Sequence, residues 1–585
     1  MQVFEREVSG RRYRILATSV RVAGKKHPVS RQVSLGPVED AAPFVPAQCR
    51  EAGFRRVGDV GALIAVAEEL EVLEAFDEVA PRTGDGPSLG ELILAVALQR
   101  VCEPGGKVDL SKFVASSVPR FTALSPGRLT GQAFHRMTRQ VSEQTYDLVQ
   151  LAIAKKACAL YGLKTDVLAF DTTNFDTFLD TKTKGASLAQ RGHAKSKRGD
   201  LRVVGLALMT SRTSSVPLFH RTYAGNESDK TVLANALGAL AGLHRGFGGT
   251  DRTLVRDGGF AGEQLEIQLG EAGYKSVSVL ALSNTVARAA LSGAVGHLQR
   301  LPGKLRDLRA FRTRAKVGEL ERTLIVVESP ELLAGQLRGM NAAARKAKRE
   351  LRRIAKRLAA QADGTSRGRR VTLASLNKRV RDLTAREHVG EILTIEIGGT
   401  EGHPTLRFEE NRDARRKLIR ERLGKRVLTT DQHSWSTGQI VRAFRSLWRV
   451  ERAFRRMKRG GVSPWGPSFQ WTDDSLRAHT FATVLGLQLA TLVRLKMQRE
   501  GVRLSTRRCL QTLAGMRLTR LLAYGPRGGP REVLVAPRID PVMTKAVRLF
   551  RLDRWTTLFS ATTPNHAKPL RKRSRATLDS GAVRK

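Results

Sequence analysis

Cysteine is scarce in this sequence, and its few copies stand far apart. The four cysteines among 585 residues are Cys49, Cys102, Cys158 and Cys509. They form neither a Cys-x2-Cys knuckle nor an evident disulfide framework, and the eleven histidines offer no ligand-like pair one helical turn apart. A zinc site is therefore not expected, and this use of cysteine fits a reducing cytoplasm.

Long apolar runs and acidic residues are also lacking. There is no uninterrupted apolar run of about 18 residues and no signal-peptide core, so no membrane partner is expected. Lys and Arg total 101 against 55 Asp and Glu, a formal net charge of +46 that is spread along the whole chain. A polyanionic partner is therefore expected, and nucleic acid is favoured.

Hydrophobic residues make up 41% of the chain, which is enough for the core of a folded protein. Changes in hydrophobic spacing divide the chain into six regions. They are a small β-rich unit at 1–50, a helical region at 51–163, a sheet domain at 164–290, an insertion with a helical hairpin at 291–430, the return of the sheet domain at 431–500, and a helical region with a basic tail at 501–585.

The region 164–290 predicts an α/β (α+β) fold. Its elements follow the order strand, strand, strand, helix, strand, helix, strand, which is that of a ribonuclease-H-like mixed sheet. The first strand, DVLAFDTTNF, carries Asp171, and the fourth, TLVRDGG, ends on Asp257. One strand-terminal aspartate is more often a turn or helix cap than a catalyst, but two of them on neighbouring strands favour a catalytic pair.

The insertion contains a heptad pattern that predicts a helical hairpin. The apolar seam consists of Leu333, Leu337, Met340, Ala344, Ala347, Leu351, Ile354 and Leu358, and it resumes at Leu373, Leu376, Val380 and Leu383. The rest of the first helix is strongly basic. A DNA-gripping arm and a solvated coiled-coil face explain that charge equally well.

The stretch FRSLWRVERAFRRMK, residues 444–458, has helical periodicity and one acid, Glu451. Arg445, Arg449, Arg452 and Arg456 form one stripe of this helix. Glu451 lies on the other, mainly apolar stripe, where a carboxylate needs a positive partner. Either Arg455 at i+4 or a metal ion would serve. We expect the Glu451 stripe to face inward and the arginine stripe outward, towards packing partners or DNA phosphate.

These motifs resemble the DDE transposases of bacterial insertion sequences, in the branch grouped with insertion sequence four. Tyr-x2-Arg-x3-Glu-x6-Lys marks that branch, and this chain has Phe444, Leu447, Glu451 and Lys458 at those spacings. The stretches FDTTNF, GNESD, RDGGF and WRVERAFRRMK look like one sub-branch, and the resemblance covers nearly the whole chain. Since the tyrosine and the arginine are replaced, the DNA contacts that they make in the family are not carried over.

The resemblance implies a site for two divalent ions, Mg²⁺ or Mn²⁺, held by Asp171, Asp257 and Glu451. It also implies that Lys458 contacts the transposon end. Further DNA-binding candidates on the same helix are Trp448, Arg449, Arg452 and Arg455. Trp448 would either stack on an unpaired base or pack in the core. Asn226 and Asp229 of GNESD form either a turn with a helix cap, which we favour, or a support behind the metal ligands. HAKSKR at 193–198 is either a solvated loop, which is slightly favoured, or a specific phosphate clamp.

The implied function is that of a DNA transposase. Such an enzyme binds the ends of its element, hydrolyses a phosphodiester to free a 3′-OH, and joins that hydroxyl to target DNA. The alternatives are a nuclease of the same fold without strand transfer and a non-catalytic DNA-binding protein derived from a transposase. The expected partners are double-stranded transposon ends, met by the region 51–163, and target DNA. A homodimer on the DNA ends and a cytoplasmic, nucleoid-associated location are also expected.

Overall fold

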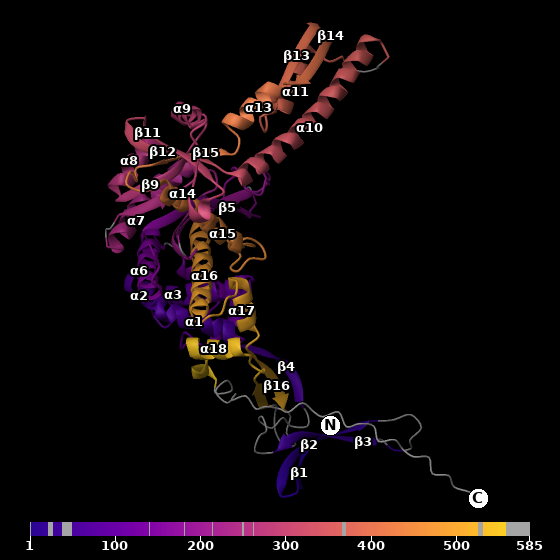
Figure 1. Ribbon diagram of the computed structural model, residues 1–585. Coiled ribbons are helices and arrows are strands. Elements are labelled where there is room, and N and C mark those ends of the chain that lie inside the picture. Colours follow the sequence, from indigo (N-terminus) through magenta and orange to yellow (C-terminus); the bar gives the residue numbers. More distant parts are fainter. Residues whose placement is uncertain are drawn as a thin grey trace, which may run out of the picture.

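The computed structural model describes residues 2–20, 27, 29–37, 49–82, 84–139, 141–180, 182–212, 214–248, 251–260, 262–365, 370–523 and 531–556. The basic carboxyl-terminal tail predicted from the sequence lies outside these residues. Figure 1 shows an elongated arrangement in which a sheet domain carries a projecting arm, a helical bundle follows it, and short strands lie beyond the bundle.

A nine-stranded mixed sheet forms the centre of the sheet domain. Its strands are β5 (Val167–Thr177), β6 (Arg202–Ser211), β7 (Pro217–Ala224), β8 (Arg252–Val255), β9 (Tyr274–Leu280), β10 (Gln299–Arg300), β11 (Arg309–Val317), β12 (Leu320–Glu328) and β15 (Lys425–Thr430). They are ordered β10-β11-β12-β15-β9-β8-β5-β6-β7. β8 is parallel to both β5 and β9, and the other neighbours are antiparallel. The predicted ribonuclease-H-like sheet, with its first and fourth strands adjacent, is confirmed.

The sheet is buried where its strands are continuously apolar. β6, with the sequence RVVGLALMTS, is buried at every residue but the first, as expected of a central strand covered on both faces. The helices of the sheet domain outside the arm are α7 (Asp229–Gly246), α8 (Glu263–Glu271), α9 (Thr285–Ala294), α14 (Thr437–Arg445) and α15 (Trp448–Met457). α15 packs against β5 and β6, α8 and α14 pack against β9, and α9 packs against β11 and β12. α7 packs against α8.

The helical bundle combines the amino-terminal region with the carboxyl-terminal one. Its helices are α1 (Gly58–Glu69), α2 (Val72–Val79), α3 (Leu89–Cys102), α4 (Leu110–Ala115), α5 (Gly131–Met137), α6 (Glu143–Tyr161), α16 (Asp473–Arg499), α17 (Thr506–Ala514) and α18 (Pro541–Phe550). The long helix α16 touches α1, α3, α17 and α18 and also β7. Of the described helices only α16 is long and apolar enough to cross a membrane, and 94% of its apolar window is buried inside the protein. It is the central packing element between bundle and sheet.

Two small antiparallel sheets extend from the bundle. β1 (Gln2–Val8), β2 (Arg11–Val20) and β3 (Val29–Pro37) form one of them. β4 (Cys49–Arg56), β16 (Arg517–Ala523) and β17 (Arg531–Val535) form the other. Since β4 pairs with β16, segments from the two end regions of the chain meet in one sheet.

The arm is a folded unit with its own core. It consists of α10 (Pro330–Ala362), α11 (Leu373–Thr384), α12 (Val389–Ile392), β13 (Leu393–Thr400), β14 (His403–Glu410) and α13 (Arg412–Glu421). Six residues of the predicted heptad seam are the buried residues of α10, and Leu376 and Val380 continue the core on α11. They pack with residues of β13, β14 and α13 in a separate apolar cluster. The amide of Ser329 donates to the carbonyl of Gly424 at 2.8 Å, so the arm begins and ends at one point.

This junction differs from the boundary expected at residue 291. The strands β10, β11, β12 and β15 belong to the nine-stranded sheet, so the sheet pattern does not stop there. β11, with the sequence RAFRTRAKV, lies near the sheet edge and leaves its basic side chains exposed or half-buried. Charge at the edge of a sheet protects it from pairing with other chains. The inserted unit is therefore residues 330–423.

Candidate active site

Asp171 lies in β5 just beyond the residues that pair with β8. β5 pairs with β8 only from Val167 to Ala169, whereas its pairing with β6 continues past Asp171. The β8 side of the strand is thus open at this point. Asp257 follows β8 by two residues and accepts a hydrogen bond from the amide of Gly258 at 2.8 Å.

The two aspartates are close enough to influence each other. Burial raises the pKa of Asp171 to about 6, with smaller contributions from the charges of Asp257 and Asp229 and against the opposing effects of Lys195 and of a hydrogen bond from the Thr172 amide. Asp171 is therefore influenced by two other carboxylates and by one lysine.

Asp229 is a member of this site that the sequence had assigned to a turn and cap. It is the first residue of α7, but Ser228 is the residue that caps the helix. The Asp229 carboxylate instead accepts a hydrogen bond from the Thr172 hydroxyl at 2.7 Å. A Cβ atom on Gly259 would lie 2.9 Å from the same carboxylate, so the glycine of RDGGF permits this close approach.

The HAKSKR loop is largely exposed, as expected of a solvated loop, but hydrogen bonds to β5 anchor it beside Asp171. Asn174 of β5 donates to the carbonyl of His193 at 2.8 Å and accepts from the amide of Lys195 at 3.0 Å. Ser196 donates to Asp176 at 2.7 Å. The Lys195 ammonium group donates to the carbonyl of Thr172. The residues of β5 that hold the loop, Thr172, Asn174 and Asp176, stand at alternate positions of FDTTNFD. This alternation of polar residues could have predicted that one face of the strand binds a polar segment.

Glu451 lies on α15 and is exposed. A turn at residues 446–447 separates α14 from α15, so the predicted single helix is broken. The buried face of α15 consists of Val450, Ala453, Phe454 and Met457. The predicted inward orientation of the Glu451 stripe is therefore wrong, because this apolar face packs on β5 and β6 instead. Glu451 and Arg455 are both described, and no ion pair joins them.

The other candidates lie on α15 or, like Lys458, directly after its last residue. Lys458 and Arg455 are exposed like Glu451. Trp448 is 41% exposed, and the guanidinium groups of Arg449 and Arg452 lie 4.7 and 5.6 Å from the centre of its ring. An exposed indole with cations over it is a surface on which a base can stack.

The residues present fit a divalent metal ion, although they do not form a complete set of ligands. Asp171 and Asp257 supply hard carboxylate oxygens at the point where the pairing of the interior strands β5 and β8 ends. Within the described part of the chain, no three acidic, histidine or cysteine side chains lie close enough together to hold a metal. Mg²⁺ is usually bound by one or two carboxylates together with waters and substrate phosphates, so the two aspartates match the number of protein ligands that such an ion needs.

A comparison with protein families matches residues 162–462 to the model described as "Transposase DDE domain". The chain belongs to this family. The match begins just before β5 and ends just after α15, so it contains the whole nine-stranded sheet and the arm. The protein is thus a DDE transposase, an enzyme of a class that uses divalent metal ions.

Curated proteins and solved structures were compared as well. No curated protein matches the chain. Among solved structures, a cryo-EM structure of a piggyBac transposase synaptic complex with hairpin DNA is similar over 80% of this chain and 82% of that chain, with a TM-score of 0.37 and 10% sequence identity.

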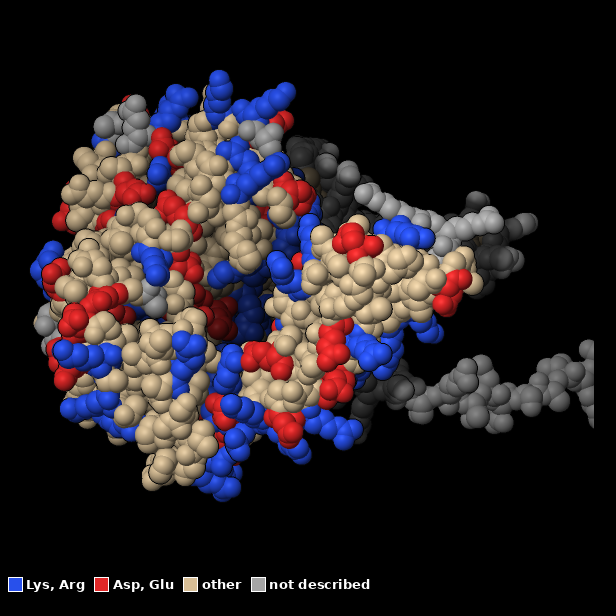
Figure 2. All heavy atoms as spheres, turned by 90° about the horizontal axis from the view of Figure 1, so that it is seen from above, with Lys and Arg blue, Asp and Glu red and all other residues tan. Residues whose placement is uncertain are grey.

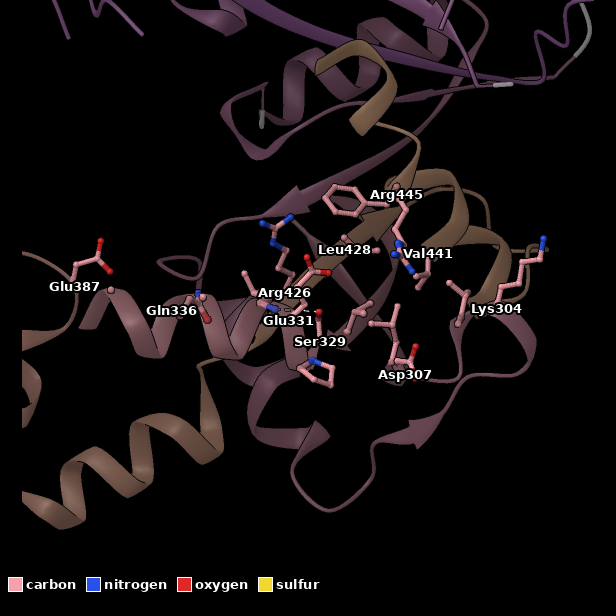
Figure 3. A pocket seen from close by; sticks show the side chains of 18 residues that line it. Lys304, Asp307, Ser329, Glu331, Gln336, Glu387, Arg426, Leu428, Val441 and Arg445 are labelled. Atoms are coloured by element: carbon pink, nitrogen blue, oxygen red, sulfur yellow. Dashed lines mark hydrogen bonds between the residues drawn. The ribbon is translucent and has the colours of Figure 1, made fainter. Parts of the chain in front are cut away.

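A separate cavity of about 810 Å³ lies where the arm of this transposase joins the sheet (Figure 3). Ser329, Glu331 and Gln336 at the start of the arm line it together with Arg426 of β15 and Arg445 of α14. Neither Asp171 nor Asp257 lines it, so it belongs to the junction. Figure 2 shows a hollow between the arm and the sheet domain, with basic and acidic side chains on its walls.

Proposed function

We propose that this enzyme is a DNA transposase of the insertion-sequence-four-like group. It binds the ends of an insertion sequence, hydrolyses a phosphodiester to free a 3′-OH, and uses that hydroxyl to attack target DNA. The observation that carries the proposal is that Asp171 of β5 and Asp257, two residues after the parallel neighbouring strand β8, are close enough for their charges to interact.

In this proposal Asp171, Asp257 and Glu451 hold two Mg²⁺ or Mn²⁺ ions. Bound metal of this kind activates the attacking oxygen and stabilises the leaving oxygen in phosphoryl transfer. Glu451 would come from the exposed face of α15, which packs beside β5. Lys195, held beside Asp171 by Asn174, would meet the phosphate that approaches the two aspartates.

DNA contact is assigned to the basic surface of the same helix. Lys458 and Arg455 share the exposed face of Glu451, and Trp448 presents a partly exposed ring. Arg449 and Arg452 would contact backbone phosphates, which position DNA without reading its sequence. The net charge of +46 supports DNA as the partner, and the proposed forms are double-stranded transposon ends and target DNA. The proposal also includes a homodimer on the ends and a cytoplasmic, nucleoid-associated location.

The test is a cleavage and joining assay with DNA that carries the sequences flanking the gene. The wild-type protein with Mg²⁺ or Mn²⁺ should release a 3′-OH end and join it to a target plasmid. Glu451→Gln should bind the same DNA without cutting it, because it loses the charge and keeps the volume. Cutting without joining would indicate a nuclease, and binding without cutting by the wild type would indicate a non-catalytic DNA-binding protein.

A further inference from the structure

Helices α15, α16 and α17 enclose a hollow of about 480 Å³ whose walls are rich in arginine. Its arginines are Arg449, Arg452, Arg456, Arg494 and Arg499. Two serines of the β6–β7 turn, Ser214 and Ser215, and Ser505 before α17 also line it. No Asp or Glu is among the described residues that line the hollow. This surface therefore carries positive charge without an acid beside it.

A second hollow of about 300 Å³ continues the first. The two share Arg452, Arg456 and Ser505, and the second adds Arg455 and Arg507. Its lining, too, contains no acidic residue within the described part of the chain. Together the two hollows form a basic groove along α15.

The arginines of the groove are held at an electrostatic cost. Burial, together with the neighbouring charges of Arg452 and Arg494, lowers the pKa of Arg456 to about 10. Burial and Arg452 likewise lower the pKa of Arg494. Their hydrogen bonds go to neutral groups, because Arg456 donates to the Thr491 hydroxyl at 3.3 Å and Arg494 donates to the Gln498 amide oxygen. The Nε atom of Arg494 is buried without a hydrogen-bond partner.

Buried arginines in the sheet domain show how this protein pairs such groups elsewhere. Arg256 and Arg322 both form ion pairs with Glu266, and Arg322 also approaches Asp431. No such ion pair is found for Arg452, Arg456 or Arg494 among the described residues. The groove is therefore not part of the internal ion-pair network, and a bound external anion would supply the negative charge that its arginines lack.

The arrangement of the groove fits phosphate groups. Guanidinium groups match phosphate oxygens in a two-pronged geometry and are less strongly hydrated than ammonium groups. Arg449, Arg452 and Arg456 recur at helical spacing along one face of α15, with a rise of about 4.5 to 6 Å between successive members. The amino-terminal end of α17, nine residues long and capped by Ser505, opens on the same groove and favours negative charge.

We propose that this groove binds the sugar–phosphate backbone of one strand of the transposon-end DNA, with Arg452, Arg456 and Arg494 as the central phosphate contacts. The inference rests on the proposed function and extends the phosphate contact assigned there to Arg449 and Arg452 into a groove that also contains Arg456 and Arg494. This groove lies on a face of α15 other than the one that bears Glu451 and Lys458. A DNA strand carries one phosphate per nucleotide, so a row of positive charges can contact several phosphates of the same strand. The indole of Trp448, over which Arg449 and Arg452 lie, provides a place for a base of the same strand.

The test compares two double variants with equal loss of charge. Arg456→Gln with Arg494→Gln removes charge from the groove, whereas Arg288→Gln with Arg306→Gln removes it from exposed positions near α9 and β11. Binding of labelled oligothymidylate and of a random-sequence duplex is measured by fluorescence anisotropy over a range of salt concentrations. A second measurement follows the thermal unfolding midpoint with and without tripolyphosphate.

The groove variant should bind both probes at least about tenfold more weakly than the control. Its salt slope should be smaller by about 0.7 to 0.9 for each phosphate that the variant no longer neutralises. Its unfolding midpoint without anion should not fall, because mutual repulsion is relieved, and tripolyphosphate should no longer raise it. Arg456→Lys with Arg494→Lys should recover part of the affinity.

Binding by the groove variant equal to that of the control would overturn this inference, as would an equal effect of tripolyphosphate on both variants. If the double variant is unfolded, Arg452→Gln alone is judged by the same two measurements. Failure of the wild-type protein to bind either probe in a salt-dependent way would instead count against the proposed function itself.

Discussion

The carboxylates of Asp171 in β5 and Asp257 after β8 form one charged site, and the arginine groove of α15 and α16 forms another of opposite sign. In the first, burial and neighbouring acids raise the pKa of Asp171 to about 6. In the second, burial and neighbouring arginines lower the pKa of Arg456 to about 10. Both sites keep like charges together in the folded protein, and both are open to a ligand. Such an arrangement costs stability unless a partner of opposite charge binds, which is typical of functional sites.

The difference between the two sites lies in the partner that each one suits. A small group of carboxylate oxygens at a strand edge suits a divalent cation, whereas a row of guanidinium groups suits a polyanion. α15 lies between them, with Glu451 on its exposed face and Arg452 and Arg456 on its half-buried face. One helix can thereby link the position of the DNA backbone to that of the reacting phosphate.

Replacing Asp171 or Asp257 with asparagine should have the largest effect. Each change removes one charge and little volume, so cleavage should fall by about a thousandfold or more if several kcal/mol of metal-dependent stabilisation is lost. DNA binding should persist, because the arginine groove is untouched. The matched control is Asp200→Asn, an exposed carboxylate paired with Arg198. Metal-dependent nicking at the wild-type rate in Asp257→Asn would remove Asp257 from the site.

The sequence predicted the acidic site far better than the basic one. Strand order alone placed Asp171 and Asp257 on neighbouring strands, since the topology of a mixed sheet fixes which strands meet. The charge pattern of α15 was also visible, but the turn at 446–447 changed which residues face inward. Helical periodicity does not show which stripe is buried when both stripes contain apolar and basic residues.

Residues that depend on distant contacts were not predictable. Lys195 reaches Asp171 only because Asn174 fixes its loop, and Arg494 faces α15 only because α16 packs beside it. In the sequence Arg494 is the first of three basic residues, with Lys496 and Arg499, that follow a mainly apolar stretch, a pattern typical of the end of a core helix. The strands β10 to β12 were missed because the charged residues of an edge resemble those of an exposed helix.

Lys107 is a buried cation without an acidic partner, like the groove arginines, but no large ligand can reach it. It is buried, and its ammonium group lies 3.0 Å from Nδ1 of His479 and over the ring of Phe134. Burial lowers the pKa of Lys107 to about 7, with Arg100 adding to the effect. We expect Lys107 to affect stability but not DNA binding.

The expected pH dependence follows from the sign of this shift. The unfolded chain binds a proton at Lys107 up to about pH 10, whereas the folded protein releases it at about pH 7, so stability should rise with pH between these values. Lys107→Met should remove a dependence on the order of 4 kcal/mol. Urea unfolding at several pH values measures this, and an unchanged pH profile in the variant would show that Lys107 is not the group responsible.

Removing the arm tests whether its basic residues act like those of the groove. Several of them face acids, as Lys348 and Arg415 do with Glu410 and as Arg353 does with Glu350. The arm has a separate core, and Ser329 already contacts Gly424, so a short Gly-Ser linker in place of 330–423 should leave the sheet domain folded. End binding should weaken by about tenfold, because fewer phosphates would be neutralised. An insoluble product would mean that the arm supports the sheet, and unchanged binding would mean that its charge is only solvated.

Lys458→Ala should have the smallest effect and separates the two faces of α15 most finely. Lys458 is exposed and follows the last residue of the helix, so its loss should change stability by under about 0.5 kcal/mol. A lysine one residue past the helix end, about 10 Å along from Glu451, is too far away to share its metal but can hold a phosphate near the scissile bond. We therefore expect binding of random DNA to change little, whereas cleavage at the element ends becomes less precise, as sequencing of the cut ends would show.

The groove variants should show the reverse pattern, with weaker binding of every DNA and unchanged cut positions in the product that remains. If Lys458→Ala cuts at the wild-type positions and rate, Lys458 is an ordinary surface lysine and positioning depends on the groove alone.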